Sequence, residues 1–279
     1  MLGAASDRRT YLAIDPDGRR VTLKEIALAT ARDAQMLEAF EREARLLRQL
    51  RHPRIPSFVD SFAVGEGPAL RFYVAHRYVE GVPLDREIEQ RLYTEREVLD
   101  VLEQILRTLA DLQSLSPPVF HRDVKPANLI RRPDGRLVLV DFGAARERTT
   151  TLRSATMVGT VGYMPPEQLA GQVDRTSDPY AAGATALHML THRQPWEFMD
   201  GPELRLPKLP ISAGAQRLLA RLLAPNREKR FADAAQAVRA LVRLRRGSSR
   251  NRAAAAAVVI AVLGGAAAGI YGVIRGWPW

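Results

Sequence analysis

Four short segments of the chain contain residue types that can handle a phosphate group. Lys24 lies in a strand-like segment, and Glu43 follows nineteen residues later in a segment of helical periodicity. Residues 121–128 read HRDVKPAN, and residues 141–143 read DFG at the end of a short apolar run. A lysine supplies a point charge for phosphate, and carboxylate and amide oxygens suit Mg²⁺. These types indicate phosphoryl transfer, which depends on positioning and charge neutralisation more than on covalent catalysis.

The order and spacing of the four segments resemble the eukaryotic-like serine/threonine protein kinases found in bacteria. The resemblance covers about residues 2–244, and HRDVKPANL followed by DFG is its most specific part. It implies an α+β, two-lobed fold, with a β-rich N-lobe over 1–79 and a larger helical C-lobe over 80–245. Within the C-lobe, residues 144–166 are expected to form the activation loop. The implied ligands are ATP, Mg²⁺ (with Mn²⁺ as an alternative ion) and proteins that offer a serine or threonine hydroxyl.

The resemblance assigns catalytic roles residue by residue. It implies that Asp123 orients the acceptor hydroxyl and accepts its proton. Lys125, which is typical of the serine/threonine class, is expected to contact the transferred phosphate. Asn128 and Asp141 are the expected metal ligands. Thr160 is expected to support Asp123 and Lys125 and to select serine or threonine substrates.

A second set of residues is expected to bind ATP. By resemblance, Lys24 contacts the α- and β-phosphates while Glu43 holds it forward. On spacing alone the two would be a solvated strand lysine and an exposed helix charge, and the downstream segments favour the paired interpretation. Gly3 matches the family's glycine-rich loop, and His76 aligns with the gatekeeper. The expected adenine contacts are the backbone of Arg77 and Val79 and the side chain of Ile130.

Regulation and stability are implied for further positions. Arg122, beside the catalytic aspartate, resembles kinases in which this arginine pairs with a phosphate on the activation loop. The sequence does not choose among the candidate phosphosites, and a plain polar loop is the alternative. These candidates are Thr149, Thr150, Thr151, Ser154 and Thr156. The residues expected to be structural are His121, Phe142, Gly143 and Asp178, together with Glu167 and Arg230, which resemble the buried pair that closes the C-terminal lobe.

The sequence departs from the family pattern at its start. Ala5 and Arg8 stand where the loop has glycines, and Asp7 adds a negative charge near the expected phosphates. Each replacement restricts the approach of backbone N–H groups to phosphate. Because the chain begins at this loop, the first strand is expected to be missing or truncated. The five residues Lys24, Glu43, Asp123, Asn128 and Asp141 are all present, which favours an active kinase. The alternative is a membrane-tethered pseudokinase that acts as a binding scaffold.

Composition excludes several other classes of protein. The chain of 279 residues contains no cysteine, so it has no disulfide, cysteine nucleophile or thiolate metal site. Its net charge is +10, and the last acidic residue is Asp233. Six arginines then follow between Arg239 and Arg252, and residues 246–252 are expected to be a basic juxtamembrane linker. No aromatic residues interleave with these arginines, so nucleic acid is not an expected partner.

The C-terminal segment has the composition of a membrane span. Residues 253–274 contain no charge, and as a helix they would extend about 33 Å, against about 30 Å for a bilayer core. The arginines before the span predict a single-pass protein of the cell membrane with a cytoplasmic kinase domain and a short extracytoplasmic tail, 275–279. Membrane lipid is therefore an expected partner. A buried alanine-rich helix of a soluble protein is the alternative.

The predicted span also offers a weak signal for a homodimer. Ala261, Gly265 and Gly269 are spaced by four residues and form a small-residue face that can pack two membrane helices. Dimerisation would bring two activation loops together for phosphorylation in trans. Alanine-rich spans also produce such spacing by chance.

Overall fold

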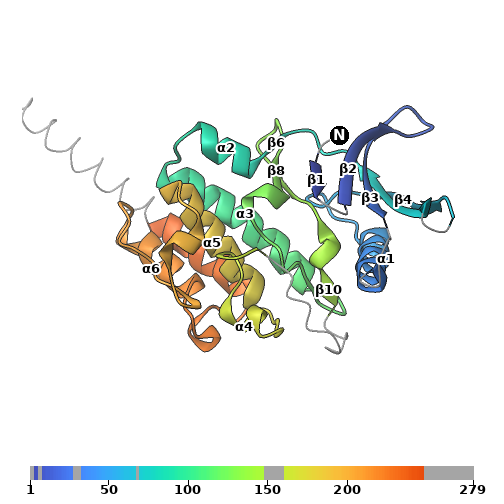
Figure 1. Cartoon of the computed structure of the whole chain (residues 1–279). Coiled ribbons are helices and arrows are strands. Elements are labelled where there is room, and N and C mark those ends of the chain that lie inside the picture. The colour runs from blue at the N-terminus through green and yellow to red at the C-terminus, as the bar shows by residue number, and fades with distance from the viewer. Residues whose placement is uncertain (1–2, 6–7, 28–32, 67–68, 148–159, 248–279) are drawn as a thin grey trace, which may run out of the picture. The chain divides into compact units, whose positions relative to one another are not determined.

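The structure is a computed structural model that describes residues 3–5, 8–27, 33–66, 69–147 and 160–247 (Figure 1). Met1–Val238 form one compact unit, and Arg239–Trp279 are a second one. Within the described residues no helix is both long and apolar enough to cross a bilayer. The predicted span over 253–274 and the candidate phosphosites between Thr149 and Thr156 lie outside the described residues.

The N-terminal part is a five-stranded antiparallel sheet with one helix against it (Figure 1). Asp15 and Gly18 close the β2–β3 hairpin, where Gly18 adopts φ +77° and donates its N–H to the Asp15 carbonyl oxygen (2.9 Å). The strands lie in the order β1-β2-β3-β5-β4. Their bounds are β1 Gly3–Ala5, β2 Arg8–Ile14, β3 Arg20–Ala27, β4 Phe58–Val64 and β5 Arg71–Arg77.

Helix α1 (Asp33–Gln49) is positioned by its apolar stripe. Phe40, Ala44 and Leu47 recur at intervals of three or four residues and are buried. Phe40 also packs edge-on against Phe72 of β5, with ring centroids 6.1 Å apart. Glu43 lies within this stripe, so the packing that holds the helix also carries its carboxylate toward the sheet.

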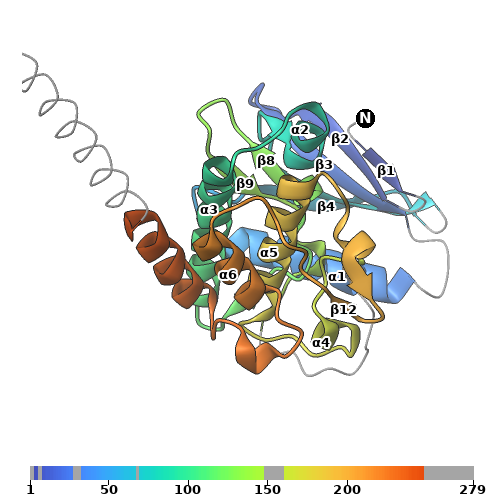
Figure 2. The ribbon, with the colours of Figure 1, turned by 90° about the vertical axis from the view of Figure 1, so that its left-hand side faces the viewer.

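The C-terminal part is mainly helical, and α3 and α5 pack side by side at its centre (Figure 2). The helices are α2 Leu84–Gln90, α3 Glu95–Gln113, α4 Pro166–Leu169, α5 Ser177–Thr191, α6 Ala213–Leu222 and a last one over 234–247. The short strands are β6 Val82–Pro83, β7 Val119–Phe120, β8 Leu129–Arg131, β9 Leu137–Leu139, β10 Arg146–Glu147, β11 Met199–Asp200 and β12 Glu203–Leu204. The 3₁₀ turns are η2 Pro126–Asn128, η3 Phe142–Ala144, η4 Pro195–Phe198 and η5 Arg227–Lys229.

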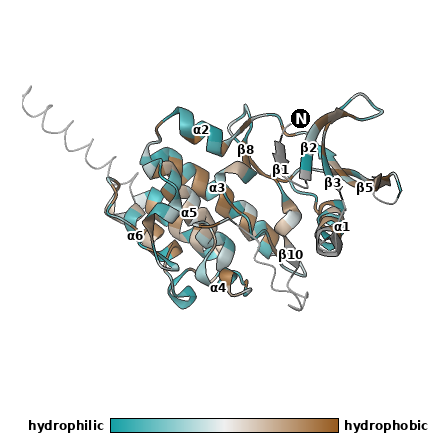
Figure 3. Cartoon of the chain, viewed as in Figure 1, coloured by the Kyte–Doolittle hydropathy of each residue, from teal (hydrophilic) through white to brown (hydrophobic). Residues whose placement is uncertain are grey.

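The core of this part follows from the sequence of its two central helices. Along α3, hydrophobic and hydrophilic positions alternate with helical periodicity (Figure 3), and Thr94 and Glu97 form a capping box at its start. Helix α5 is buried over most of its length. At Gly183 a Cβ atom would lie 2.9 Å from the Cβ of Leu222, so glycine allows α5 to approach α6 closely. The helices thus form a rigid base for the loops between β7 and β9.

Candidate active site

Lys24 and two carboxylates form the first cluster of the site. The Lys24 Nζ atom lies 2.5 Å from Glu43 Oε1 on α1 and 2.9 Å from Asp141 Oδ1 after β9. The side chains of Lys24 and Glu43 are largely buried, at 18% and 6% exposed, whereas that of Asp141 is 43% exposed. Side chains from strand β3, helix α1 and the segment after β9 therefore come together at the Lys24 ammonium. The contact between Lys24 and Glu43 is the one that the sequence predicted.

These charges act strongly on one another. Burial alone would lower the pKa of the Lys24 ammonium, but the carboxylates of Asp141 and Glu43 raise it above its ordinary value. The Lys24 charge in turn holds the pKa of Asp141 well below its usual range, against the opposing effect of burial. Lys24 and Asp141 are consequently both charged at neutral pH.

The second cluster surrounds the carboxylate of Asp123. The hydroxyl of Thr160 donates to Asp123 Oδ1 (2.9 Å) and accepts from Lys125 Nζ (2.7 Å). Lys125 Nζ also lies 2.9 Å from Asp123 Oδ2. Asn128 Nδ2 donates to Asp123 Oδ2 (3.0 Å) and to the Asp123 carbonyl oxygen (2.8 Å). All four residues predicted to be catalytic are therefore joined in one hydrogen-bonded group, 37 positions apart at their extremes.

The β8–β9 hairpin brings the two predicted metal ligands to the same end of one sheet. Asn128 precedes β8 and Asp141 follows β9, and the Val140 N–H donates to the Asn128 carbonyl oxygen (2.9 Å). Asp141 adopts a left-handed conformation with φ +66°, and the Gly143 N–H donates to its Oδ1 atom (3.4 Å). A non-glycine residue at positive φ is strained, and such strain is common at functional sites.

The donor set fits a hard divalent cation bound together with phosphate. Asn128 uses its amide nitrogen on Asp123, which leaves its amide oxygen for another ligand. Asp141 offers a second, partly exposed oxygen donor. Among the described residues, no three histidine, aspartate or glutamate side chains gather as a metal site of their own. Mg²⁺ usually takes one or two protein oxygens and completes its shell with phosphate and water, which is the arrangement these residues suit.

Buried anchors fix the loop that carries Asp123. The Asp178 carboxylate at the start of α5 accepts the backbone N–H of His121 (2.7 Å) and of Arg122 (2.8 Å). Arg122 has φ +69°, and its carbonyl oxygen accepts from Gln168 Nε2 (2.7 Å). Burial raises the pKa of Asp178, and the two N–H donors oppose that effect. The loop is thus held by its backbone, and its side chains are left for chemistry.

His121 and Phe142 pack together beneath the site. The His121 ring is buried, meets Phe142 edge-on at 4.8 Å between centroids, and places Nε2 3.2 Å from the Val140 carbonyl oxygen. This contact joins the Asp123 loop to the segment that contains Asp141 and Gly143. The structure therefore brings the predicted packing residues together between the two clusters.

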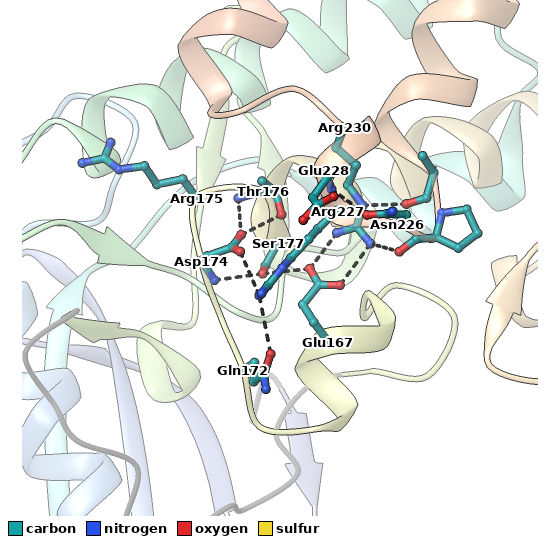
Figure 4. A network of polar contacts seen from close by, with 12 residues as sticks. Glu167, Gln172, Asp174, Arg175, Thr176, Ser177, Asn226, Arg227, Glu228 and Arg230 are labelled. Carbon is teal, nitrogen blue, oxygen red and sulfur yellow. Dashed lines mark hydrogen bonds and ion pairs between the residues drawn. The ribbon is translucent and has the colours of Figure 1, made fainter.

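Glu167 of α4 and Arg230 form a two-pronged ion pair in the helical part of the chain (Figure 4). The guanidinium donates to Oε1 at 2.6 Å and to Oε2 at 3.0 Å, and both side chains are at least nine-tenths buried. Arg230 also donates to the carbonyl oxygens of Ala224 and Pro225 and lies over the ring of Tyr180. The pair joins α4 to the segment before the last helix.

Comparison with models of protein families matches residues 2–241 to the protein kinase domain. The chain belongs to the protein kinase domain family. The serine/threonine-protein kinase PknA of Nostoc sp. is 34% identical to it over 262 residues, which cover 86% of this chain and 45% of that protein. The serine/threonine-protein kinase B of Synechocystis sp. is 40% identical over 173 residues, 57% of this chain and 29% of the relative.

A third relative, the serine/threonine-protein kinase PrkC of Bacillus subtilis, is 32% identical over 215 residues, which cover 75% of this chain and 32% of that protein. The chain is thus similar to bacterial serine/threonine kinases. It spans about half or less of the length of each of these relatives.

In this kinase domain two of the residues expected to contact adenine, Arg77 and Val79, lie at the end of β5 and two residues after it. Arg77 turns its guanidinium to Asp15 at the β2–β3 turn, while its backbone N–H donates to the Ser57 carbonyl oxygen (2.8 Å). His76 is buried, and its Nδ1 atom lies 3.2 Å from the Arg77 carbonyl oxygen. Val79 and Ile130 are half-buried. The Arg77 side chain and backbone N–H thus both have partners within the protein, and its carbonyl oxygen, which also lies near His76 Nδ1, is the Arg77 group with acceptor capacity left for a nucleotide.

The buried side chain of His76 is expected to make the stability of the kinase domain depend on pH. Burial, and then the nearby Lys24 charge, lower the pKa of His76 from 6.5 to about 4. The unfolded chain takes up this proton as the pH falls below 6.5, whereas the folded chain does not do so until about pH 4. His76 therefore contributes stability that is present above pH 6.5 and is lost on acidification.

We expect His76→Met to remove this part of the pH dependence. Between pH 7 and pH 4.5, roughly 2 kcal/mol of unfolding free energy should be lost by the wild type and retained by the variant. Urea titrations followed by circular dichroism at both pH values measure the difference. His192→Asn, at an exposed left-handed position that asparagine tolerates, should lose as much unfolding free energy between the two pH values as the wild type does. An equal loss in His76→Met and in the wild type would contradict the expectation.

The stretch that matches the glycine-rich loop of the family lies largely within two paired strands. Gly3, Ala4 and Ala5 of β1 pair with Thr10, Arg9 and Arg8 of β2. Ala5 and Arg8 therefore face each other across the ladder, and Asp7 lies outside the described residues. The pairing places Gly3 opposite Thr10, beside the strand that carries Lys24.

Two sets of polar contacts between distant segments were not predicted from the sequence. The buried Tyr163 hydroxyl lies 2.6 Å from His188 Nδ1 on α5 and donates to Gln194 Oε1 (3.1 Å). Asp111 of α3 accepts from His52 Nε2 and from Arg54, each at 3.0 Å, and so ties the loop after α1 to the helical part. These partners are far apart in the chain, and no local motif marks them.

Proposed function

We propose that the chain is a serine/threonine protein kinase that transfers the γ-phosphoryl group of ATP to protein hydroxyls. The observation that carries the proposal is the pairing of two clusters: Lys24, Glu43 and Asp141 on one side, and the hydrogen-bonded group around Asp123 on the other. The first cluster suits the phosphates of ATP, and the second suits an acceptor hydroxyl. The family match and the names of its relatives support the same activity.

In the proposed reaction the acceptor oxygen forms a bond to the γ-phosphorus while the bond from that phosphorus to the bridging oxygen breaks. The proton of the acceptor hydroxyl passes to the Asp123 carboxylate, and ADP leaves. Thr160 and Asn128 hold the two carboxylate oxygens, so Asp123 keeps its orientation during proton transfer. Lys125, in contact with the same carboxylate, supplies positive charge to the transferred group.

Nucleotide binding is assigned to the other cluster. Lys24 neutralises the α- and β-phosphates and Glu43 restrains it, while backbone groups of Arg77 and Val79, with Ile130, contact adenine. Mg²⁺, held by Asn128 and Asp141, would supply charge neutralisation at the phosphates. Gly3 and the backbone of β1 would lie over them. Arg122 would pair with a phosphate on the activation loop, at one of the candidates between Thr149 and Thr156.

A pseudokinase scaffold is the second candidate, and one observation favours it. The positions of two loop glycines are taken by Ala5 and Arg8, which pair across β1 and β2. Side chains there restrict the approach of backbone N–H groups to phosphate. All the residues of the two clusters are nonetheless in place, so we rank the active enzyme first.

Transfer of ³²P from ATP by the full chain tests the activity. With Mg²⁺ and a generic protein acceptor, the wild type should incorporate label on serine or threonine, and Asp123→Asn should lose about 10²- to 10⁴-fold. Restoring glycine by Ala5→Gly and Arg8→Gly should lower the KM for ATP. If neither the wild type nor the glycine variant incorporates label, the pseudokinase is the better description.

We also propose that residues 253–274 anchor the kinase in the cell membrane, with the catalytic domain in the cytoplasm. The uncharged composition of this segment and the arginines before it support the proposal. Retention of the full chain in membranes after alkaline carbonate extraction is the expected result. Release into the supernatant would favour the buried alanine-rich helix, and cross-linking of the intact chain in membranes tests the homodimer.

A further inference from the structure

The helix over residues 234–247 presents a row of basic side chains on one face. Arg239, Arg243 and Arg246, which we call the arginine stripe, are all exposed. At 3.6 residues per turn the three positions fall within an arc of roughly 60° around the helix axis. Three guanidinium groups are therefore presented in the same direction.

The opposite face of this helix is apolar and buried. Its buried residues are Ala234, Ala237, Val238 and Leu241. The buried residues and the arginine stripe therefore fall on opposite faces of one amphipathic helix.

The charge of the arginine stripe is not balanced within the part of the chain that the structure describes. Some exposed arginines elsewhere pair on their own helix or turn, as with Arg107 and Glu103 (2.7 Å) or Arg193 and Glu197 (2.9 Å). Others, such as Arg86 and Arg96, form no ion pair among the described residues but stand singly rather than in a row. The last acidic residue of the whole sequence is Asp233, so no carboxylate side chain follows on this helix. Among the described residues, none forms an ion pair with a member of the stripe.

We infer that the arginine stripe binds the headgroups of anionic phospholipids. The inference rests on the proposed membrane anchor, since the stripe ends only six residues before the uncharged run 253–274. A guanidinium presents paired N–H donors that match a phosphate group, and it stays charged at all relevant pH values. Each basic residue close to an anionic membrane contributes roughly a fivefold gain in binding, so three together contribute roughly 100-fold.

Contact of the arginine stripe with lipid headgroups would orient helix 234–247, which a membrane span alone does not do. A span alone leaves the preceding helix free to rotate and tilt relative to the lipid surface. Docking the arginine stripe sets which side of helix 234–247 meets the headgroups, and it makes that orientation depend on the anionic lipid content. The interaction is electrostatic, so it weakens as salt screens the charges.

A single fluorescent label on the full chain can report the contact. The natural sequence has no cysteine, so Gly247→Cys creates a unique thiol. A Cβ atom at position 247 meets nothing within 4 Å, so the label site is sterically open. The labelled chain is inserted into nanodiscs of phosphatidylcholine alone or of an equimolar mixture with phosphatidylglycerol. Acrylamide, a neutral quencher, then measures how far the label is shielded from water.

We expect quenching to be at least about twofold weaker in the anionic discs than in the neutral ones. About 1 M NaCl should abolish the difference, because the Debye length falls to about 3 Å. The stripe variant should also lose the difference, whereas a control variant that removes three other exposed arginines should keep it. The stripe variant is Arg239→Gln, Arg243→Gln and Arg246→Gln. The control is Arg51→Gln, Arg86→Gln and Arg136→Gln.

Three outcomes would overturn the inference: equal quenching in the two lipids, an unchanged response in the stripe variant, or protection by a DNA oligonucleotide in neutral discs with none from phosphatidylglycerol. Co-elution of chain and disc is scored separately. If the chain elutes with both kinds of disc but acrylamide quenching is the same in the two lipids, the inference about the arginine stripe is wrong and the proposed membrane anchor stands. If it elutes with neither, the anchor fails and the inference falls with it. Transfer of ³²P by the stripe variant reports the kinase activity independently.

Discussion

Arg230→Met is expected to lower the free energy of unfolding by about 3 to 5 kcal/mol. The substitution leaves the Glu167 carboxylate buried, and among the described side chains the Ser177 hydroxyl (3.2 Å) then remains as its one hydrogen-bond donor. It also removes the donors to the carbonyl oxygens of Ala224 and Pro225. An unpaired buried charge costs far more than the net value of the pair, which is why the expected loss is large. Urea titration of the full chain, followed by circular dichroism, measures it.

A matched control separates burial from the simple loss of an ion pair. Arg193 pairs with Glu197 at 2.9 Å, but the two side chains are 57% and 36% exposed. Arg193→Met should therefore cost less than about 1 kcal/mol. Combining Arg230→Met with Glu167→Leu should recover part of the stability, because the orphaned carboxylate is gone. If Arg230→Met lowered the free energy of unfolding no more than Arg193→Met, the burial of the Glu167–Arg230 pair would not increase the cost of breaking it.

Local patterns were sufficient to predict the elements that position the site. The spacing of Phe40, Ala44 and Leu47 predicts α1, and the helix does bury these residues and carry Glu43 to Lys24. Asp15-Pro16-Asp17-Gly18 is a turn signal in the sequence, and these residues do close β2 and β3. Each of these signals lies within a few residues of the feature that it specifies, so a single sequence is enough to read it.

Contacts between distant segments were predicted only where a family motif marked both partners. Asp123 with Thr160 and Glu167 with Arg230 are of this kind, and the structure brings each pair together. Tyr163 with His188 has no such motif, although the hydroxyl and ring nitrogen lie 2.6 Å apart. Such a contact depends on how α5 packs beneath the loop before α4. Periodicity and turn signals carry no information on that packing.

Backbone strain was equally invisible in the sequence. Arg122 and Asp141 both adopt positive φ, although neither is glycine. Glycine, asparagine and aspartate are the residue types that adopt positive φ most readily, so Arg122 is the clear exception. Here Asp178 and Gln168 hold the backbone around Arg122 by hydrogen bonds from other elements. Tertiary contacts therefore override the local preference at the residue next to Asp123.

Lys24→Met is expected to reduce kcat/KM for ATP by about 10²- to 10³-fold, the range found when one group that stabilises transition-state charge is removed. Lys24 is the only described residue that bridges Glu43 and Asp141, and methionine keeps the length of the side chain while removing its charge. Initial rates of ³²P transfer at varied ATP concentration measure the effect. Lys208→Met, at an exposed lysine, should leave the rate unchanged. Full activity of Lys24→Met would refute the assignment of the phosphate-binding lysine.

Glu43→Gln shows whether the glutamate acts through Lys24. Glutamine can still accept a hydrogen bond from Nζ, and Asp141 still holds the ammonium at 2.9 Å, so the expected loss is smaller, about tenfold. Because Glu43 touches the reaction only by restraining Lys24, adding Glu43→Gln to Lys24→Met should cause little further loss. If the double variant lost kcat/KM by the product of the two separate factors, Glu43 would have a role of its own. In that case its burial beside β3 would need an explanation other than the orientation of Lys24.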